Sequence, residues 1–291
     1  MKKAAFAAII GRPSAGKSTL MNQICGEKVA ITSKVPQTTR NAIRGIVNRE
    51  QGQLVFVDTP GRYKSHKKGN RALLRVSAWA VEDTDLILFV LDAARQQGAE
   101  DAEVAALVSR YAARLVVVIN KIDAVAEDGC GPALEFLAQH LPAVPQERIF
   151  RTSAWKNEGI QPLLDALFAL AGEGEPFYGE DYCTDQPLKF RLAEIIREQV
   201  INRVYDELPH TIRVEVEDVQ HAGDSYMYPK SNPTQERVWI RAFIIVKRES
   251  QKGIVVGKGG EMIKAIRQGA RKEMRRIYNW QIVLDLYVKV E

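Results

Sequence analysis

The sequence predicts an α/β domain built on a mostly parallel sheet, followed by a smaller α+β domain. Strand-like and helix-like segments alternate from residue 4 to about residue 170, which is typical of parallel strands covered by helices. Glycine, proline and acidic residues interrupt this alternation over 172–187, and the later segments follow a different order. We therefore expect a first domain over 1–171, a linker over 172–187 and a second domain over 188–291, sizes that a 291-residue chain allows.

The first domain is expected to alternate strands and helices from its first residues. The predicted strands are residues 4–10, 44–57 (two strands joined by a turn at Gln51-Gly52), 86–91, 115–119 and 148–150, and the predicted helices are residues 19–25, 72–81, 101–111, 132–139 and 161–170. The hairpin within 44–57 would add one antiparallel edge strand. Ligands of such sheets bind at the carboxyl ends of the strands, so candidate site residues are expected there.

The turn after the first strand carries the pattern G-x-x-x-x-G-K-S. Backbone N–H groups of such a turn, together with the dipole of the helix that follows, form a cradle for phosphate. Lys17 is expected to reach the outer phosphates, and the Ser18 hydroxyl is expected to hold Mg²⁺. The residues that we expect to bind nucleotide here are Gly11, Arg12, Pro13, Ser14, Ala15, Gly16, Lys17, Ser18 and Thr19.

The identity of the base is indicated by Asn120-Lys121-Ile122-Asp123, at the end of the strand over 115–119. The Asp123 carboxylate can accept hydrogen bonds from the ring N–H and the amino group of guanine, a donor pair that adenine lacks. Leaving a buried carboxylate unpaired costs on the order of a few kcal/mol, so guanine is expected to be preferred. Asn120 and Lys121 would brace this loop, and Ser153-Ala154 would place a backbone N–H near the guanine oxygen.

Two further segments are expected to respond to the γ-phosphate. Asp58-Thr59-Pro60-Gly61 follows a strand, so Asp58 can hold Mg²⁺ through water and the Gly61 N–H can meet the γ-phosphate. Thr39, with Thr38 as the alternative, would complete the Mg²⁺ shell formed with Ser18 and Asp58. We expect Lys17, Thr39 and Gly61 to act in catalysis, and loss of the γ-phosphate to release both segments.

The second domain has the element order of a KH-type RNA-binding module. A helix over 188–204 precedes strands over 211–219 and 237–246, and a G-x-x-G turn over 257–260 separates two helices before a last strand over 281–290. The helix over 261–277 is basic, with eight basic and two acidic residues in 252–276. An ordinary helix–helix turn with a solvated basic face is the alternative. The predicted RNA-binding residues are Lys252, Ile254, Val255, Gly257, Lys258, Gly259, Gly260, Lys264, Arg267 and Arg271.

Composition excludes several classes of protein. No apolar run approaches the ~20 residues of a membrane span, and three scattered cysteines are typical of reduced thiols in the cytoplasm. The net charge of +5 suits a partner that carries negative charge.

Together these motifs resemble the Era family of bacterial GTPases over essentially the whole length. The resemblance rests on residues 11–18, 37–40, 58–61, 120–123, 153–154 and 257–260, and on similar sequence at 180–185 and 194–198. It implies an α/β P-loop GTPase domain followed by a type II KH domain, with GTP, GDP and Mg²⁺ as ligands. It also implies binding near the 3′ end of small-subunit ribosomal RNA during 30S assembly. We expect a cytoplasmic monomer that binds no DNA; some members associate with the inner face of the membrane.

Two positions depart from the family pattern. Ser14 stands where many relatives carry an Asn that helps hold K⁺ beside the phosphates, so a role for K⁺ stays open here. Arg62 follows Gly61 where a hydrophobic residue is usual; it would either stabilise transition-state charge or belong to a basic loop that contacts RNA. No general base is evident, so unassisted hydrolysis is expected to be slow.

Two other functions are weighed against this one. The second domain could dock a protein partner, in which case RNA binding would be weak and independent of sequence. It could instead belong to an RNA-modifying enzyme, but it has no Cys, His or carboxylate cluster for such chemistry, so this alternative ranks last.

Overall fold

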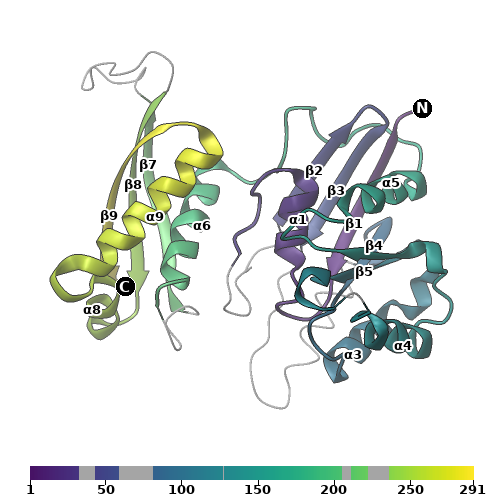
Figure 1. Cartoon of the computed structure of the whole chain (residues 1–291). Helices are drawn as coiled ribbons and strands as arrows, with labels where there is room; N and C mark the ends of the chain where they lie inside the picture. The colour runs from purple at the N-terminus through teal and green to yellow at the C-terminus, as the bar shows by residue number, and fades with distance from the viewer. Residues whose placement is uncertain (33–42, 59–80, 127, 205–210, 222–235) are drawn as a thin grey trace. The chain divides into compact units, whose positions relative to one another are not determined.

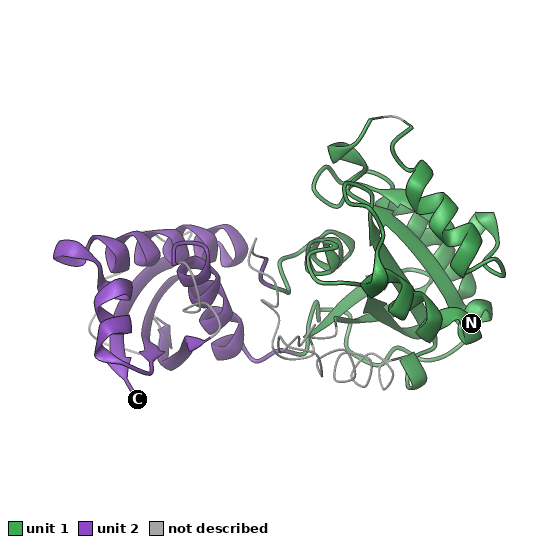
Figure 2. Ribbon diagram, turned by 90° about the horizontal axis from the view of Figure 1, so that it is seen from below, with its two compact units in different colours: residues 1–30, 36–185 green, residues 31–35, 186–291 purple. Residues whose placement is uncertain are grey.

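The structure is a computed structural model of the chain, and it describes residues 1–32, 43–58, 81–126, 128–204, 211–221 and 236–291. Contacts divide the chain into two compact units, one formed by residues 1–30 and 36–185 and the other by residues 31–35 and 186–291 (Figure 2). The predicted helix over 72–81, apart from its last residue, lies outside the described residues. No helix within the described ranges is long and apolar enough to cross a membrane.

The first unit is built on a six-stranded sheet in the order β2-β3-β1-β4-β5-β6 (Figure 1). The strands are β1 (Lys3–Ile10), β2 (Ile43–Arg49), β3 (Gly52–Asp58), β4 (Leu86–Asp92), β5 (Leu115–Asn120) and β6 (Ile149–Thr152). Every neighbouring pair is parallel except β2 and β3, which are antiparallel. This confirms the predicted mixed, mostly parallel sheet with one antiparallel edge strand. The carboxyl ends of the parallel strands β1, β3, β4, β5 and β6 lie at one edge of this sheet.

Helices cover both faces of this sheet and bury two separate apolar cores. They are α1 (Lys17–Cys25), α3 (Ala99–Val108), α4 (Gly131–His140) and α5 (Ile160–Leu170). Alternate side chains of β1 point to opposite faces: Ala7 and Ile9 pack in the core with α1 and α5, and Ala8 and Ile10 pack in the core with α3 and α4. Burial on both faces explains why the central strands are continuously apolar.

The helix predicted over 101–111 has different bounds in the structure. It begins earlier because the Asp101 carboxylate accepts the Gly98 N–H at 3.1 Å, which caps the first turn. It ends at Val108, and the chain continues as a 3₁₀ turn over Ser109–Arg114.

The segment over 172–185 packs on the first unit through the side chain of Gln53. This side chain is fully buried, and its oxygen accepts the N–H groups of Phe177 at 2.8 Å and Tyr178 at 3.0 Å. Its amide nitrogen donates to the Tyr178 carbonyl at 2.9 Å and to Asn48 Oδ1 at 2.7 Å. The Ile46 N–H on edge strand β2 donates to a carbonyl of the same segment at 2.8 Å. The linker sequence is therefore attached to the edge of the sheet, which it also covers.

The second unit is a three-stranded sheet in the order β7-β8-β9 with helices on one face (Figure 1). Its elements are α6 (Leu188–Ile201), β7 (Arg213–His221), β8 (Arg237–Val246), α8 (Glu249–Val256), α9 (Glu261–Tyr278) and β9 (Gln281–Val290). β7 is antiparallel to β8, and β8 is parallel to β9. Alternate residues of β8, such as Ile240 and Ala242, pack with Ile266 and Ala270 of α9 in one core. This is the element order that predicted a KH domain, and the prediction is confirmed.

We expect Gln53→Ala to release the 172–185 segment from the first unit. The change leaves the Phe177 and Tyr178 N–H groups without their acceptor, so the free energy of unfolding should fall by about 1–3 kcal/mol. Hydrogen exchange of these two amides should accelerate more than that of the β1 amides. Gln51→Ala, at an exposed position of the same hairpin, is the matched control and should change neither quantity. Unchanged exchange at Phe177 and Tyr178 would contradict this role for Gln53.

Candidate nucleotide-binding and RNA-binding sites

The loop between β1 and α1 has the backbone shape of an anion cradle. Ser14 and Gly16 adopt left-handed conformations, with φ of 62° and 94°, which turns successive N–H groups toward the inside of the loop. The Lys17 ammonium donates to the carbonyls of Gly11 and Arg12, both at 2.9 Å, so it lies across the loop. Its burial lowers the pKa of Lys17, and the Asp58 carboxylate acts in the opposite direction.

This loop packs directly on the ends of β4 and β5. A Cβ on Gly16 would lie 2.4 Å from Asn120 Nδ2, and a Cβ on Gly11 would lie 2.4 Å from the Val90 carbonyl oxygen. Asn120 Nδ2 also donates to the Ala15 carbonyl at 3.2 Å. The two glycines of the motif are therefore required by close contact as well as by their positive φ.

Two of the predicted Mg²⁺ ligands lie together. The Ser18 hydroxyl donates to Asp58 Oδ2 at 2.8 Å, at the start of α1 and the end of β3. A hydroxyl and a carboxylate beside a phosphate cradle are oxygen donors that fit Mg²⁺, which would neutralise phosphate charge when bound. The other predicted residues in these segments, Thr38, Thr39, Thr59, Pro60, Gly61 and Arg62, lie outside the described residues.

The base-reading residues are held by a buried hydrogen-bond cluster. Asn120 Oδ1 accepts the Thr152 hydroxyl and the Ala154 N–H, both at 3.1 Å. The Ser153 hydroxyl, itself buried, donates to Asp123 Oδ1 at 2.5 Å, while the Asp123 side chain remains exposed. Asp123 is thus oriented and still open to a ligand. The backbone N–H of Ala154 thus helps to hold Asn120, and the predicted contact of this segment with the guanine oxygen stays a prediction.

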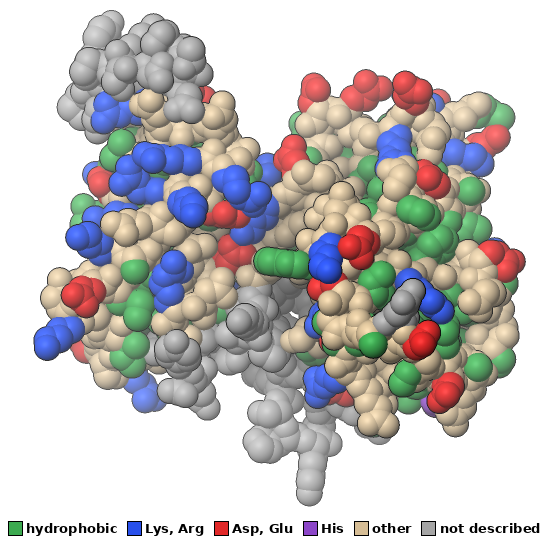
Figure 3. Space-filling model, viewed as in Figure 1, with side chains coloured by type: hydrophobic (Ala, Val, Ile, Leu, Met, Phe, Trp, Pro, Cys, Tyr) green, Lys and Arg blue, Asp and Glu red, His purple; other side chains and the backbone are tan. Residues whose placement is uncertain are grey.

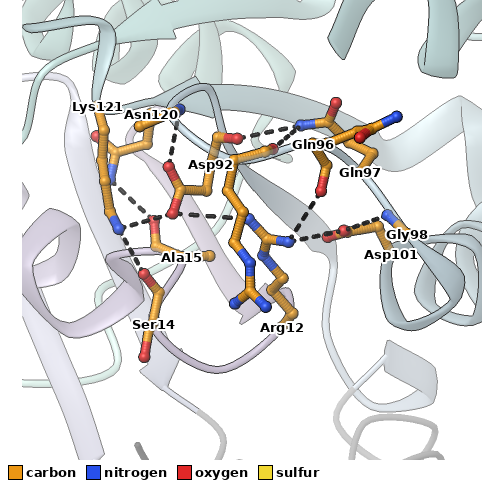
Figure 4. Close-up of polar contacts among 12 residues, drawn as sticks. Arg12, Ser14, Ala15, Asp92, Gln96, Gln97, Gly98, Asp101, Asn120 and Lys121 are labelled. Atoms are coloured by element: carbon orange, nitrogen blue, oxygen red, sulfur yellow. Dashed lines mark hydrogen bonds and ion pairs between the residues drawn. The ribbon is translucent and has the colours of Figure 1, made fainter. Parts of the chain in front are cut away.

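The side chain of Arg12 does not face the phosphate cradle. It is 4% exposed and pairs with Asp101 at 3.2 Å and with Asp92 at 3.6 Å (Figure 4). The Arg12 side chain is therefore structural, and the predicted part of Arg12 in nucleotide binding concerns its backbone within the cradle. Asp92 also accepts the Lys121 ammonium at 2.7 Å, and Lys121 donates to the Ser14 carbonyl at 2.7 Å.

Sequence reasoning missed Asp92 and Thr152. Each is the polar last residue of a strand at the edge where the other site residues lie, and this position is the signal that could have found them. Lys121 was predicted to brace the loop over 120–123, but the sequence did not identify Asp92 and the Ser14 carbonyl as its partners.

The glycine turn of the second unit combines a packed glycine with two open ones. Gly257, Gly259 and Gly260 have φ of 75°, 61° and 80°. A Cβ on Gly257 would lie 2.6 Å from Met262 Cβ, whereas a Cβ on Gly259 or Gly260 would meet no atom of the described chain within 4 Å. At Gly259 and Gly260 the backbone is therefore accessible to a ligand from outside.

Beside this turn, one predicted RNA contact is wrong. Val255 is fully buried in the core of the second unit, so its side chain cannot meet a base. Ile254, the preceding residue on α8, is 50% exposed and remains available. Of the two apolar side chains predicted to contact RNA, Ile254 is therefore the exposed one.

Basic side chains gather on the face of the second unit that carries α9 (Figure 3). Arg267 and Arg271 are half-buried and donate to the β9 carbonyls of Leu286 at 3.2 Å and Ile282 at 3.1 Å. They therefore line the boundary between α9 and the edge strand, while Lys264 is exposed. This arrangement places fixed positive charge beside the glycine turn.

Comparison with known proteins assigns both units. The family model described as a 50S ribosome-binding GTPase matches residues 6–121, and the model of the KH domain matches residues 207–291. GTPase Era of Treponema denticola is 44% identical over 282 residues, which cover 97% of this chain and 92% of that protein. The chain belongs to the Era family of GTPases. GTPase Era of Carboxydothermus hydrogenoformans is 37% identical and covers 99% of this chain and 93% of its own length.

Solved structures of Era share the fold of the whole chain. Era in complex with MgGDPNP and nucleotides 1506–1542 of 16S ribosomal RNA has a TM-score of 0.85 and 32% identity, covering 100% of this chain and 94% of that one. An Aquifex aeolicus Era variant bound to GDP·AlF4⁻ has the same TM-score and identity and covers 99% of this chain and 94% of that one. The P-loop GTPase domain followed by a KH domain is thus confirmed.

We expect nucleotide affinity to fall as the pH rises through the lowered pKa of Lys17. Phosphate favours the ammonium form, so at alkaline pH a Lys17 that is partly neutral must take up a proton on binding. Titration calorimetry of GDP in buffers of different ionisation enthalpy should detect proton uptake that grows from neutral to alkaline pH. The phosphates are already ionised in that range and cannot supply this effect. A flat affinity without proton uptake would exclude linkage to Lys17.

Proposed function

We propose that this chain is a GTP-hydrolysing switch that binds small-subunit ribosomal RNA near its 3′ end and assists assembly of the 30S subunit. One observation carries the proposal: a single Era-family chain combines two features. Asp123 is oriented beside a phosphate cradle, and a glycine turn leaves its backbone open to the backbone of another molecule. The RNA and its sequence come from the relative solved with 16S ribosomal RNA.

The described residues support a division of labour in nucleotide binding. On nucleotide binding, the Lys17 ammonium gives up its hydrogen bonds to the two loop carbonyls and binds the outer phosphates instead. This change needs little reorganisation, because the ammonium already lies inside the cradle. Ser18 and Asp58 hold Mg²⁺ together with Thr39, and the Gly61 N–H meets the γ-phosphate. We propose that K⁺ adds little, because Ser14 is shorter than the Asn of many relatives and its carbonyl is already bound to Lys121.

In the second unit we propose that RNA phosphates approach the turn over 257–260 and the exposed Lys258 and Lys264. Arg267 and Arg271 supply fixed charge along β9, Lys252 supplies charge from α8, and Ile254 offers an apolar contact. We further propose that the protein acts as a cytoplasmic monomer. We also propose peripheral association with the inner face of the membrane, which the family resemblance implies.

We expect Asp123→Asn to exchange guanine preference for xanthine preference. The amide oxygen can still accept the ring N–H, but the amide NH₂ group then faces the guanine amino group, donor against donor. The same NH₂ group can donate to the carbonyl that xanthine carries at this ring position. Loss of hydrogen bonds to a charged group should weaken GDP binding by about 1.5–3 kcal/mol. Calorimetry with GDP and xanthosine diphosphate measures both affinities. Asp128→Asn, at an exposed position five residues further along the chain, is the control. An unchanged GDP affinity in Asp123→Asn would refute the base-reading role.

We expect Gly259→Asp to weaken RNA binding more than Gly259→Asn. Both side chains tolerate a left-handed backbone and enter open space, so the pair differs only in charge. The carboxylate should repel RNA phosphate and reduce affinity about tenfold at low salt, with a smaller effect as salt rises. Binding of an RNA matching the small-subunit 3′ end, and of a scrambled RNA, should be measured with a GTP analogue, with GDP and without nucleotide.

The same experiment separates the switch from its alternative. Selective RNA binding favoured by the GTP analogue supports a switch in ribosome assembly. Binding that is indifferent to RNA sequence and nucleotide, or equal for the two Gly259 variants, would contradict the proposal and favour a domain that docks a protein partner.

A further inference from the structure

We infer that Asp92 is a positioning residue for base recognition: it holds Lys121, and with it the base-reading loop over 120–123, against the phosphate loop. The inference rests on the proposed binding of guanine nucleotide and concerns a residue outside the phosphate loop and the base-reading loop. Asp92 is the last residue of β4, which lies between β1 and β5 in the sheet. It therefore stands between the strand that leads into the phosphate loop and the strand that leads into the base-reading loop.

Lys121 connects these two loops through its side chain. Its backbone is left-handed, with φ of 67°, and its ammonium donates to Asp92 Oδ2 and to the Ser14 carbonyl, both at 2.7 Å (Figure 4). A lysine side chain is flexible, so a single carbonyl would not hold it in one position. The Asp92 carboxylate, 8% exposed, is held by the Ala94 N–H at 3.0 Å and supplies a charged and oriented second partner.

The same carboxylate is held from the other side by the phosphate loop. Arg12 Nη2 lies 3.6 Å from Asp92 Oδ2, and Arg12 Nη1 lies 3.2 Å from Asp101 and 3.4 Å from the Gln96 carbonyl. Asp92 thus contacts one cation of the phosphate loop and one of the base-reading loop. The two negative charges of Asp92 and Asp101 are matched by the two positive charges of Arg12 and Lys121. Of these four side chains, Lys121 alone is substantially exposed to solvent. Removing the charge of Asp92 leaves that cluster with excess positive charge.

The position of Asp123 depends on this contact. Asp123 is two residues after Lys121, in a tight turn in which the Ala124 N–H donates to the Lys121 carbonyl at 3.0 Å. Within the described residues, the side chains of Asn120 and Lys121 each tie this turn to the phosphate loop. Without the Asp92 charge, Lys121 loses its oriented partner, and the turn keeps a single tie to the loop that holds the phosphates. A misplacement of about 1 Å can cost a large factor in recognition.

The test compares Asp92→Asn with Asp101→Asn as a matched control. Asp101 is also buried and pairs with the same arginine, but it has no contact with Lys121. Affinities for GDP and inosine diphosphate should be measured by calorimetry, together with thermal unfolding. Inosine diphosphate lacks the amino group that Asp123 reads, so the ratio of the two affinities reports the placement of Asp123. A purely structural role would lower the unfolding temperature and leave this ratio unchanged.

We expect Asp92→Asn to lower GDP affinity about tenfold and to reduce the GDP-to-inosine-diphosphate ratio severalfold. Asp101→Asn should keep the wild-type ratio even if the protein becomes less stable. An unchanged ratio in Asp92→Asn, or an equal reduction in both variants, would overturn the inference. If Asp92→Asn does not fold, Asp92→Glu keeps the charge but displaces it by one methylene, and the same ratio decides. A wild-type protein without preference for GDP would refute the proposed function itself.

Discussion

The close contact between the phosphate loop and the base-reading loop is the constraint on which the nucleotide site depends. Gly16 and Asn120 lie so near each other that a single added carbon at Gly16 would fall 2.4 Å from the amide nitrogen. This proximity is possible because β1, β4 and β5 are parallel neighbours whose carboxyl ends meet at one edge. A loop that cradles phosphate and a loop that reads a base are thereby held at a set separation, as recognition of one nucleotide requires.

The charges at this edge are arranged before any ligand binds. Lys17 lies across the cradle on two carbonyls of its own loop, where burial makes its ammonium costly and phosphate would relieve that cost. Arg12 is directed away from the cradle into a cluster of carboxylates. Two cations of one motif therefore differ in function. Lys17 lies where a phosphate would bind, and Arg12 holds the loop to the rest of the domain.

Glycine has a different purpose in the turn of the second unit than in the phosphate loop. In the phosphate loop, glycines are needed because the protein itself is close. In the turn over 257–260, only Gly257 has such a neighbour, and Gly259 and Gly260 face open space. Glycine in an open, left-handed turn lets another backbone come near, which suits a nucleic-acid phosphate. The arginines that line β9 are partly committed to carbonyl groups, so the charge beside this turn is fixed in position.

The sequence by itself determined the chemistry of both sites and the class of both domains. Local patterns were sufficient there, because a phosphate cradle, the proposed guanine reading by Asp123 and an open glycine turn each depend on a few consecutive residues. The tertiary structure alone decided the partners of those residues. The partners of Asp92, Thr152 and Gln53 became visible only when strands distant in the chain were placed side by side. Likewise the burial of Val255 depends on which face α8 turns inward. The order of residues along the chain does not show which strands are neighbours or which face of a helix is buried. These facts follow from the order of strands in the sheet and from the packing of helices on it.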